Sequence, residues 1–76
     1  MKRFDLREYK ENAIDRLKAI LSDLAQNEAA IFIFEARDFS LVQKSADAVK
    51  ELNCDLLNSL KYNEVDWTIS IRKSGA

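Results

Sequence analysis

The sequence predicts a single α/β (α+β) domain of the two-layer sandwich kind, with both helices on one face of a mixed four-stranded sheet. Two stretches carry apolar residues at helical spacing, and a continuous apolar run at 29–34 stands between them. Right-handed strand–helix–strand crossovers that step in one direction place both helices on the same face. The last ordered stretch, 65–72, alternates apolar and polar residues, which is the period of a strand with one packed face. Its packed face is expected to carry Val65, Trp67, Ile69 and Ile71.

The first half of the sequence is expected to form a short strand and an amphipathic helix. Residues 4–7 alternate apolar and polar, which predicts the strand. The helix is expected to run from Glu11 or Asn12 to Ala25, with Asn12 as its N-cap. Asn27 can adopt the left-handed turn that ends the helix. The apolar stripe of this helix consists of Ile14, Leu17, Leu21 and Leu24.

A second helix and a hairpin are expected to complete the βαβαββ order. Ser40 opens the helix, and Gln43, three residues later, matches a capping box. Asn53 stands where a left-handed C-cap belongs. A weaker strand at 55–62 then turns at 63–64 into the final strand. The apolar face of the second helix consists of Leu41, Ser45, Ala48, Val49 and Leu52.

The apolar run at 29–34 predicts a strand that is buried on both faces or nearly so. If Ile31 and Ile33 face the helices, Phe32 and Phe34 point outward. Two neighbouring exposed rings would form an apolar patch of the kind that contacts a partner. The alternative is that long polar side chains of neighbouring strands cover both rings.

Composition and charge exclude several classes of protein. The 76 residues suffice for one domain, and 12 basic against 13 acidic residues give a net charge of −1. No global field therefore draws the protein to nucleic acid or to an anionic membrane. The longest apolar run is too short to cross a bilayer. With no charged-then-apolar leader and a single cysteine, we expect a cytoplasmic protein without a membrane partner.

The sequence predicts no catalytic residue, no metal and no cofactor. Histidine is absent, which removes the commonest general base and zinc ligand. Cys54 follows a helix C-terminus, where the helix dipole disfavours a thiolate, so a packed and unreactive residue is expected. Gly75 is the only glycine, which excludes a glycine-rich phosphate loop. The nearest carboxylates, Asp5, Glu8 and Glu11, are interpreted as solvated charges.

Basic residues near the two ends of the sequence could meet on the surface if the first and last strands are neighbours. Such a cluster would suit nucleic acid or an acidic partner protein. The acidic residues between them favour an ordinary solvated surface instead. The basic residues concerned are Lys2, Arg3, Arg7, Lys10, Arg72 and Lys73.

The order of elements, together with the opening at 4–7 and the ending at 67–73, resembles the TusA/SirA-like family. These are small sulfur-carrier proteins of bacteria and archaea, and the resemblance covers nearly the whole sequence as one domain, 1–76. Lys18 stands where the family has a basic residue in its first helix, and Asp38 where it has an acidic residue before the second. The closing Ile-Arg-Lys of the family matches 71–73.

The family's Cys-Pro-x-Pro motif is missing from this sequence. Its cysteine position falls on Glu11, or on Lys10 if the alignment shifts by one, and its first proline falls on Asn12. The second proline position holds Ile14, and the preceding glycine position holds Glu8. Glutamate cannot carry sulfane sulfur. The resemblance therefore implies a divergent relative without the catalytic thiol, which is not expected to be an enzyme.

Three functions follow as expectations. The first is a non-catalytic protein-binding or regulatory module, linked to sulfur trafficking through the resemblance, that contacts a protein partner or a second copy of itself. Its surface would combine the open sheet face with the start of the first helix, through Phe32, Phe34, Glu8 and Lys10. The second is an active sulfur carrier that uses Cys54. The third is a nucleic-acid-binding module, by fold-level analogy to translation initiation factor domains.

Overall fold

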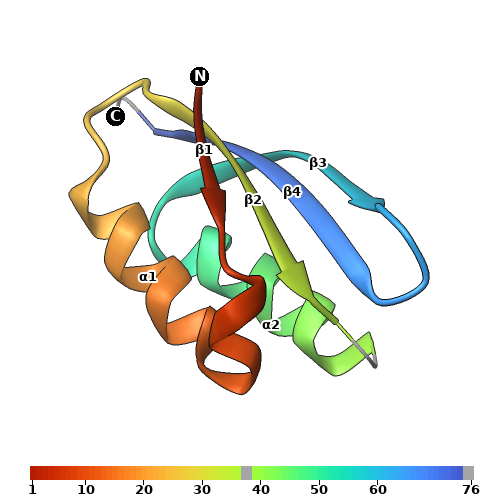
Figure 1. Ribbon diagram of the computed structural model, residues 1–76. Coiled ribbons are helices and arrows are strands. Elements are labelled where there is room, and N and C mark those ends of the chain that lie inside the picture. The colour runs from red at the N-terminus through yellow and green to blue at the C-terminus, as the bar shows by residue number, and fades with distance from the viewer. Residues whose placement is uncertain (37–38, 75–76) are drawn as a thin grey trace.

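The computed structural model describes residues 1–36 and 39–74 and confirms the predicted βαβαββ order (Figure 1). The elements are β1 (Lys2–Asp5), the 3-10 turn η1 (Arg7–Asn12), α1 (Ala13–Asp23), β2 (Ala29–Glu35), α2 (Phe39–Glu51), β3 (Cys54–Lys61) and β4 (Asp66–Lys73). Asp38 and Gly75 lie outside the described residues. Within them, no helix is long and apolar enough to cross a membrane.

The four strands form one mixed sheet in the order β1-β2-β4-β3. β1 runs parallel to β2, and β4 is antiparallel to both β2 and β3. Both helices cover the same face of this sheet, as predicted (Figure 1). The opposite face, which we call the open face, is therefore available for contact.

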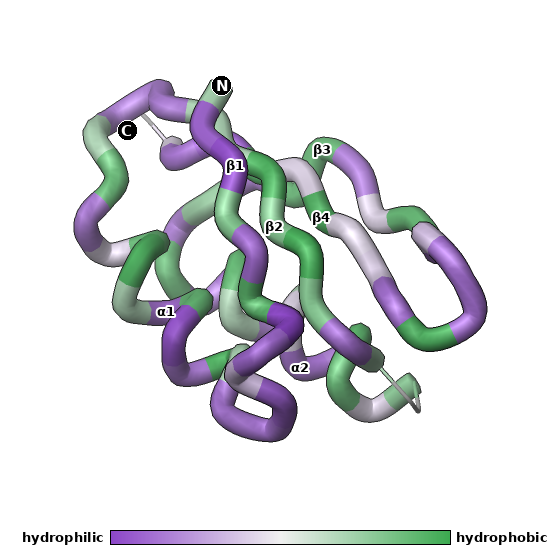
Figure 2. The backbone as a smooth tube through the Cα atoms, in the orientation of Figure 1, coloured by the Kyte–Doolittle hydropathy of each residue, from purple (hydrophilic) through white to green (hydrophobic). Residues whose placement is uncertain are grey.

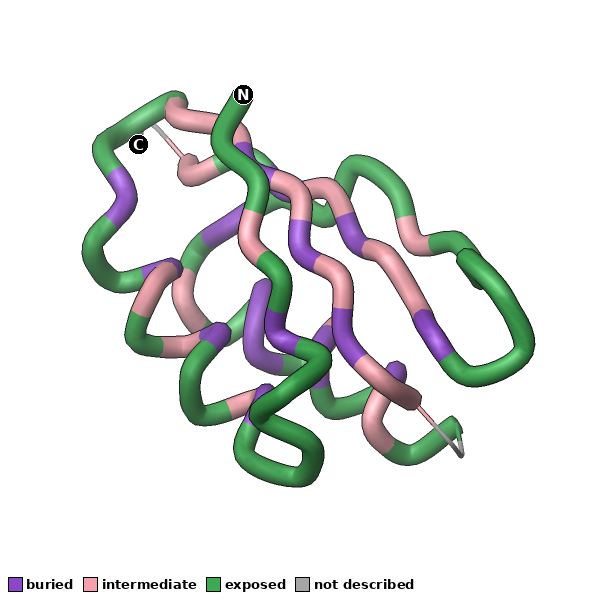
Figure 3. The backbone as a smooth tube through the Cα atoms, in the orientation of Figure 1, coloured by how far each residue is buried: buried purple, intermediate pink, exposed green. Residues whose placement is uncertain are grey.

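The strand β2 shows which side chains point toward the helices. It is hydrophobic along most of its length (Figure 2), but its burial alternates between buried and intermediate residues (Figure 3). Phe32 and Phe34 are 0% and 1% exposed and belong to the core. Ile31 and Ile33 are half-buried on the open face. The predicted orientation was therefore wrong, and the two phenylalanines cannot serve as a partner surface.

The pairing of β2 with β4 explains this orientation. Phe32 stands opposite Ile69, and Phe34 opposite Trp67. Residues directly opposite in an antiparallel pair share a face, so the rings join the packed face of β4. Phe32 also stacks on Phe4 of β1, with 5.1 Å between ring centroids. The largest apolar side chains of three strands thus meet beneath the helices.

The strand β4 confirms most of its predicted pattern. Ile69 and Ile71 are buried, and the half-buried Trp67 packs against the core. The indole Nε1–H of Trp67 donates to Ser59 Oγ at 2.7 Å, so its polar atom is satisfied. Val65 is 47% exposed and precedes the strand, which corrects its expected place on the packed face.

The region before α1 departs from the expected helix. The first strand ends at Asp5, and the 3-10 turn η1 occupies the residues up to Asn12. Asn12 is the N-cap of α1 as predicted, although its side chain makes no capping hydrogen bond. The helix ends at Asp23, so Asn27 lies in the turn that follows rather than in the C-cap. Its left-handed backbone, with φ 66°, is confirmed.

Helix α2 lies close to its predicted position. It begins at Phe39, one residue before the expected Ser40, and ends before Asn53, which has the predicted left-handed backbone with φ 58°. The side-chain amide of Gln43 donates to Asp47 one turn later, at 3.2 Å. Its buried face consists of Val42, Ser45, Ala48 and Val49.

Candidate functional site

The open face is the candidate functional site. Strand pairing arranges its side chains in rows that run across the sheet from β1 to β3. One central row consists of Arg3, Ile31, Ser70 and Asn58, and the next of Asp5, Ile33, Thr68 and Leu60. A shallow hollow of about 480 Å³ lies over these rows. Its floor is aliphatic and neutral, and its rim at β1 is charged.

Exposed apolar side chains gather beside this hollow, on β3 and the hairpin that follows it. Among the described residues, five of the eight large apolar side chains that are exposed lie between positions 56 and 65. Leu57, Leu60 and Tyr62 are 50%, 55% and 64% exposed, and Tyr62 lines the hollow. Exposed apolar groups clustered in this way are typical of a contact surface.

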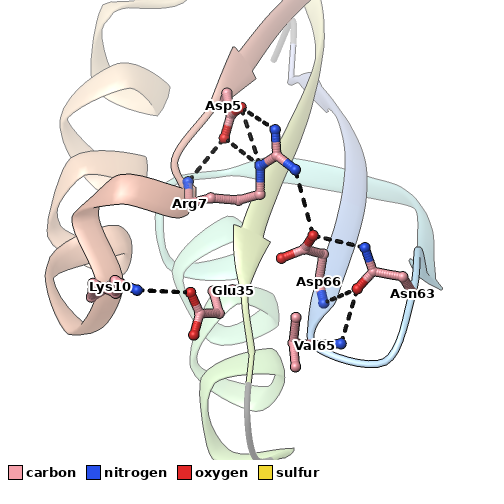
Figure 4. A network of polar contacts seen from close by, with 7 residues as sticks. All are labelled: Asp5, Arg7, Lys10, Glu35, Asn63, Val65 and Asp66. Carbon is pink, nitrogen blue, oxygen red and sulfur yellow. Dashed lines mark hydrogen bonds and ion pairs between the residues drawn. The ribbon is translucent and has the colours of Figure 1, made fainter.

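Arg7 closes one end of the open face. It follows β1, yet its side chain crosses β2 to reach β4 (Figure 4). Its Nη2 lies 2.7 Å from Asp5 Oδ2, and its Nη1 lies 3.5 Å from Asp66 Oδ2. The hydrogen bonds from Arg7 hold the pKa of Asp5 below its ordinary value. Asn63 donates to Asp66 from the hairpin loop, at 2.8 Å, which completes the network.

A second ion pair lies beside this network and holds a strained backbone. Lys10 Nζ lies 3.1 Å from Glu35 Oε2 (Figure 4). Lys10 has φ 51° and ψ −122°, a region that favours glycine. The strain falls at the junction inside η1, where the backbone turns into α1. Lysine supplies the cation there at the expense of an unfavourable backbone conformation.

Four sequence-predicted site residues lie in this same turn. Glu8, Glu11 and Asn12 are exposed, and Glu8 borders a small hollow with Asp5 and Arg7. Lys10 is occupied by its ion pair with Glu35. The turn thus adjoins one end of the open face, whereas Phe32 and Phe34 lie inside the core.

The sequence reasoning missed the residues that do form the open face. Ile31 and Ile33 were expected beneath the helices, and Leu57 and Leu60 received no role. The signal that could have identified the two isoleucines is the alternation of β4. Once Trp67 is placed inside, the pairing of the neighbouring strand determines which residues of β2 face outward.

The basic residues do not gather into a free cationic patch. Lys2 pairs with Glu28 at 3.2 Å, while Arg7 and Lys10 make the ion pairs described above. Arg72 and Lys73 donate to the backbone carbonyls of Asn27 and Leu21, each at 2.7 Å. Of the six, only Arg3 makes no ion pair or hydrogen bond within residues 1–36 and 39–74.

Cys54 is buried, and its thiol lies 3.5 Å from the carbonyl oxygen of Leu52. Burial raises the pKa of this thiol, which opposes formation of the thiolate that sulfur transfer requires. No group of three or more Cys, Asp or Glu side chains in the described part of the protein is placed to hold a metal ion.

The sequence matches a protein family over residues 1–73. That family is described as "putative NADH-ubiquinone oxidoreductase" and corresponds to the E subunit of the enzyme. The protein belongs to this family.

A solved structure similar to this E-subunit family member agrees in both sequence and fold. HP1264 from Helicobacter pylori, known as a solution structure, is 45% identical over 97% of this sequence and 99% of its own length. The TM-score between the two folds is 0.73. No protein of curated function matches the sequence. The resemblance to the TusA/SirA-like family stays a prediction, because neither match tests it.

Proposed function

We propose that this E-subunit family member is a non-catalytic protein-binding module that acts within or beside an NADH–ubiquinone oxidoreductase. The observation that carries the proposal is the open face, where aliphatic side chains and two neutral hydroxyls replace reactive groups. Such a surface can hold another protein and offers no nucleophile or general base. The family description supplies the setting in which the binding would occur.

The ligand chemistry of the sequence supports binding over electron transfer through a cluster of its own. Iron–sulfur clusters are held by four cysteine thiolates, or by two cysteines and two histidines. These 76 residues contain one cysteine and no histidine. By themselves they therefore cannot ligate such a cluster, and any cluster used in the reaction would need ligands from elsewhere.

The sulfur-carrier alternative has less support. It requires a nucleophilic thiolate, and burial of Cys54 raises the pKa of its thiol. Glu11, at the family cysteine position of the TusA/SirA-like proteins, is exposed and has no thiol to offer. Incubation with a cysteine desulfurase and a sulfur donor would expose this activity as a persulfide mass shift on Cys54. We expect no shift.

Affinity purification tests the binding proposal. We expect the protein with a C-terminal tag to co-purify NADH–quinone oxidoreductase activity from its source cells, and the isolated protein to oxidise no NADH. Leu60→Lys, on the open face, should lose the co-purifying activity. Cys54→Ala should retain it, since the thiol has no role in the proposal. Retention by Leu60→Lys together with loss by Cys54→Ala would overturn the proposal.

A further inference from the structure

We propose that the open face is the interface of a symmetric dimer, in which two copies of this protein pack sheet against sheet. The inference rests on the proposed function only in taking the open face as the docking surface. It adds the identity of the occupant, which is a second copy.

The order of side chains on the face is self-complementary. Consider a two-fold axis that lies between the sheets, perpendicular to the strands and between the two central rows. It places the row of Arg3 over the row of Asp5 of the second copy. Ile31 then faces Ile33, and Ser70 faces Thr68. At β3, Leu57 and Asn58 face Leu60, because the bulge between positions 56 and 58 opposes both to Ser70.

The charges at the rim fit this arrangement. Arg3 makes no ion pair or hydrogen bond among the residues the structure describes, so its guanidinium is available. Asp5 binds Arg7 but keeps a side-chain exposure of 53%, and a carboxylate has about four acceptor sites. The axis brings Arg3 of each copy against Asp5 of the other. An axis parallel to the strands would instead place Arg3 over the uncharged residues of β3.

The sheet edges favour face-to-face packing over strand addition. The bulge in β3 interrupts its regular spacing, and the Asn58 side chain accepts the Ser59 backbone N–H at 3.0 Å. Both features block an incoming strand. The other edge, β1, has only four residues. The exposed leucines of β3 are therefore covered through their side chains.

The size of the face predicts a weak dimer. Four strands about 4.8 Å apart, with four alternate side chains along each, give roughly 400 Å² per copy. Stable complexes bury about 800 Å² per partner. Half of that area corresponds to a transient interface with a dissociation constant on the order of 0.1–1 mM.

Sedimentation velocity of the untagged protein between about 20 µM and 1 mM tests the dimer. We expect the average mass to rise from 8.8 kDa toward twice that value. Arg3→Asp and Asp5→Arg should each remain monomeric, because like charges then meet at the rim. An equimolar mixture of the two variants should associate, since the acidic positions of one variant then face the basic positions of the other.

A pair of leucine variants guards against misfolding as an explanation, with circular dichroism as the folding check. Leu60→Lys, on the open face, should weaken association about tenfold or more. Leu56→Lys, on the same strand but opposite Ile71 on the helix side, should leave association unchanged. A wild-type protein that stays monomeric at about 1 mM, or a charge mixture that does not associate, overturns the dimer. Loss on Leu56→Lys with retention on Leu60→Lys points to edge pairing and also overturns it.

The two proposals fail separately. A monomeric protein whose Leu60→Lys variant loses oxidoreductase activity on purification would refute the dimer and leave the proposed function standing. A protein that dimerises through the open face but purifies without that activity would do the reverse.

Discussion

The guanidinium of Arg7 lies 3.5 Å from the carboxylate of Asp66, although the two residues belong to opposite sides of β2. Asp66 is only 7% exposed, and its other side-chain bond is to Asn63. Arg7 also binds Asp5 through two nitrogens. One side chain thus holds the ends of β1 and β4 together over the strand between them.

Removal of this cation should lower stability. We expect Arg7→Gln to reduce the melting temperature, because it leaves the nearly buried Asp66 carboxylate without its counter-charge. Arg3→Gln is the matched control, since Arg3 makes no bond in the described part of the protein, and should melt like wild type. Thermal unfolding followed by circular dichroism at a concentration that keeps the protein monomeric compares them. Equal melting temperatures for all three proteins would show that the Arg7 contact contributes nothing.

The same contact predicts a dependence of stability on pH. Arg7 lowers the pKa of Asp5 in the folded state below its ordinary value of 3.8. A carboxylate with a lowered folded pKa stabilises the fold above its unfolded pKa, and this contribution is lost as pH falls through the folded pKa. Urea unfolding between about pH 5 and 2.5 should therefore show a steeper loss for wild type than for Arg7→Gln. Parallel curves would contradict the assignment.

The backbone of Lys10 predicts an unusual order of stabilities. Both Lys10→Gly and Lys10→Ala remove the ion pair with Glu35, but only glycine relieves the strain of φ 51°. We expect Lys10→Gly to be more stable than Lys10→Ala by about 1 kcal/mol, the reverse of the usual order. Urea unfolding monitored by Trp67 fluorescence measures the difference. A less stable glycine variant would mean that Lys10 is not strained.

The orientation of β2 is testable by paired substitutions. Phe32→Ala should cost about 3–5 kcal/mol, because it removes a fully buried ring. Phe32→Leu, at about 1 kcal/mol, keeps the measurement possible if the alanine variant does not fold. Ile31→Ala, on the half-buried open face, should cost about 1 kcal/mol or less. A larger loss at Ile31 than at Phe32 in urea unfolding would reverse the orientation.

Much of the fold could be predicted from local pattern. The helical spacing of Leu17 and Leu21 and the alternation from Trp67 to Ile71 predicted the element order, and both leucines are fully buried. Asn27 and Asn53 were expected in left-handed conformations, and both have positive φ. Each of these predictions rests on residues within one turn or one strand, where side-chain spacing and backbone preference act directly.

The candidate site could not be predicted in the same way. The run at 29–34 has no polar residue to mark its outward face, so its orientation depends on pairing with β4. The contact between Arg7 and Asp66 joins residues far apart in sequence, and no local pattern reports it. The 3-10 turn before α1 was missed because Lys10 occupies a backbone conformation that its residue type disfavours.

The central claim, that the open face is a contact surface formed by the outward side of β2 and its neighbours, is tested most directly by amide NMR on dilution. Spectra recorded from about 1 mM to 20 µM, which brackets the expected dissociation constant, should show concentration-dependent shifts on the open face. The amides expected to shift are those of Ile31, Ile33, Thr68, Ser70 and Leu60, while amides on the outer side of α1 and α2 should stay fixed. Shifts confined to the helices, with an unchanged open face, would contradict the account.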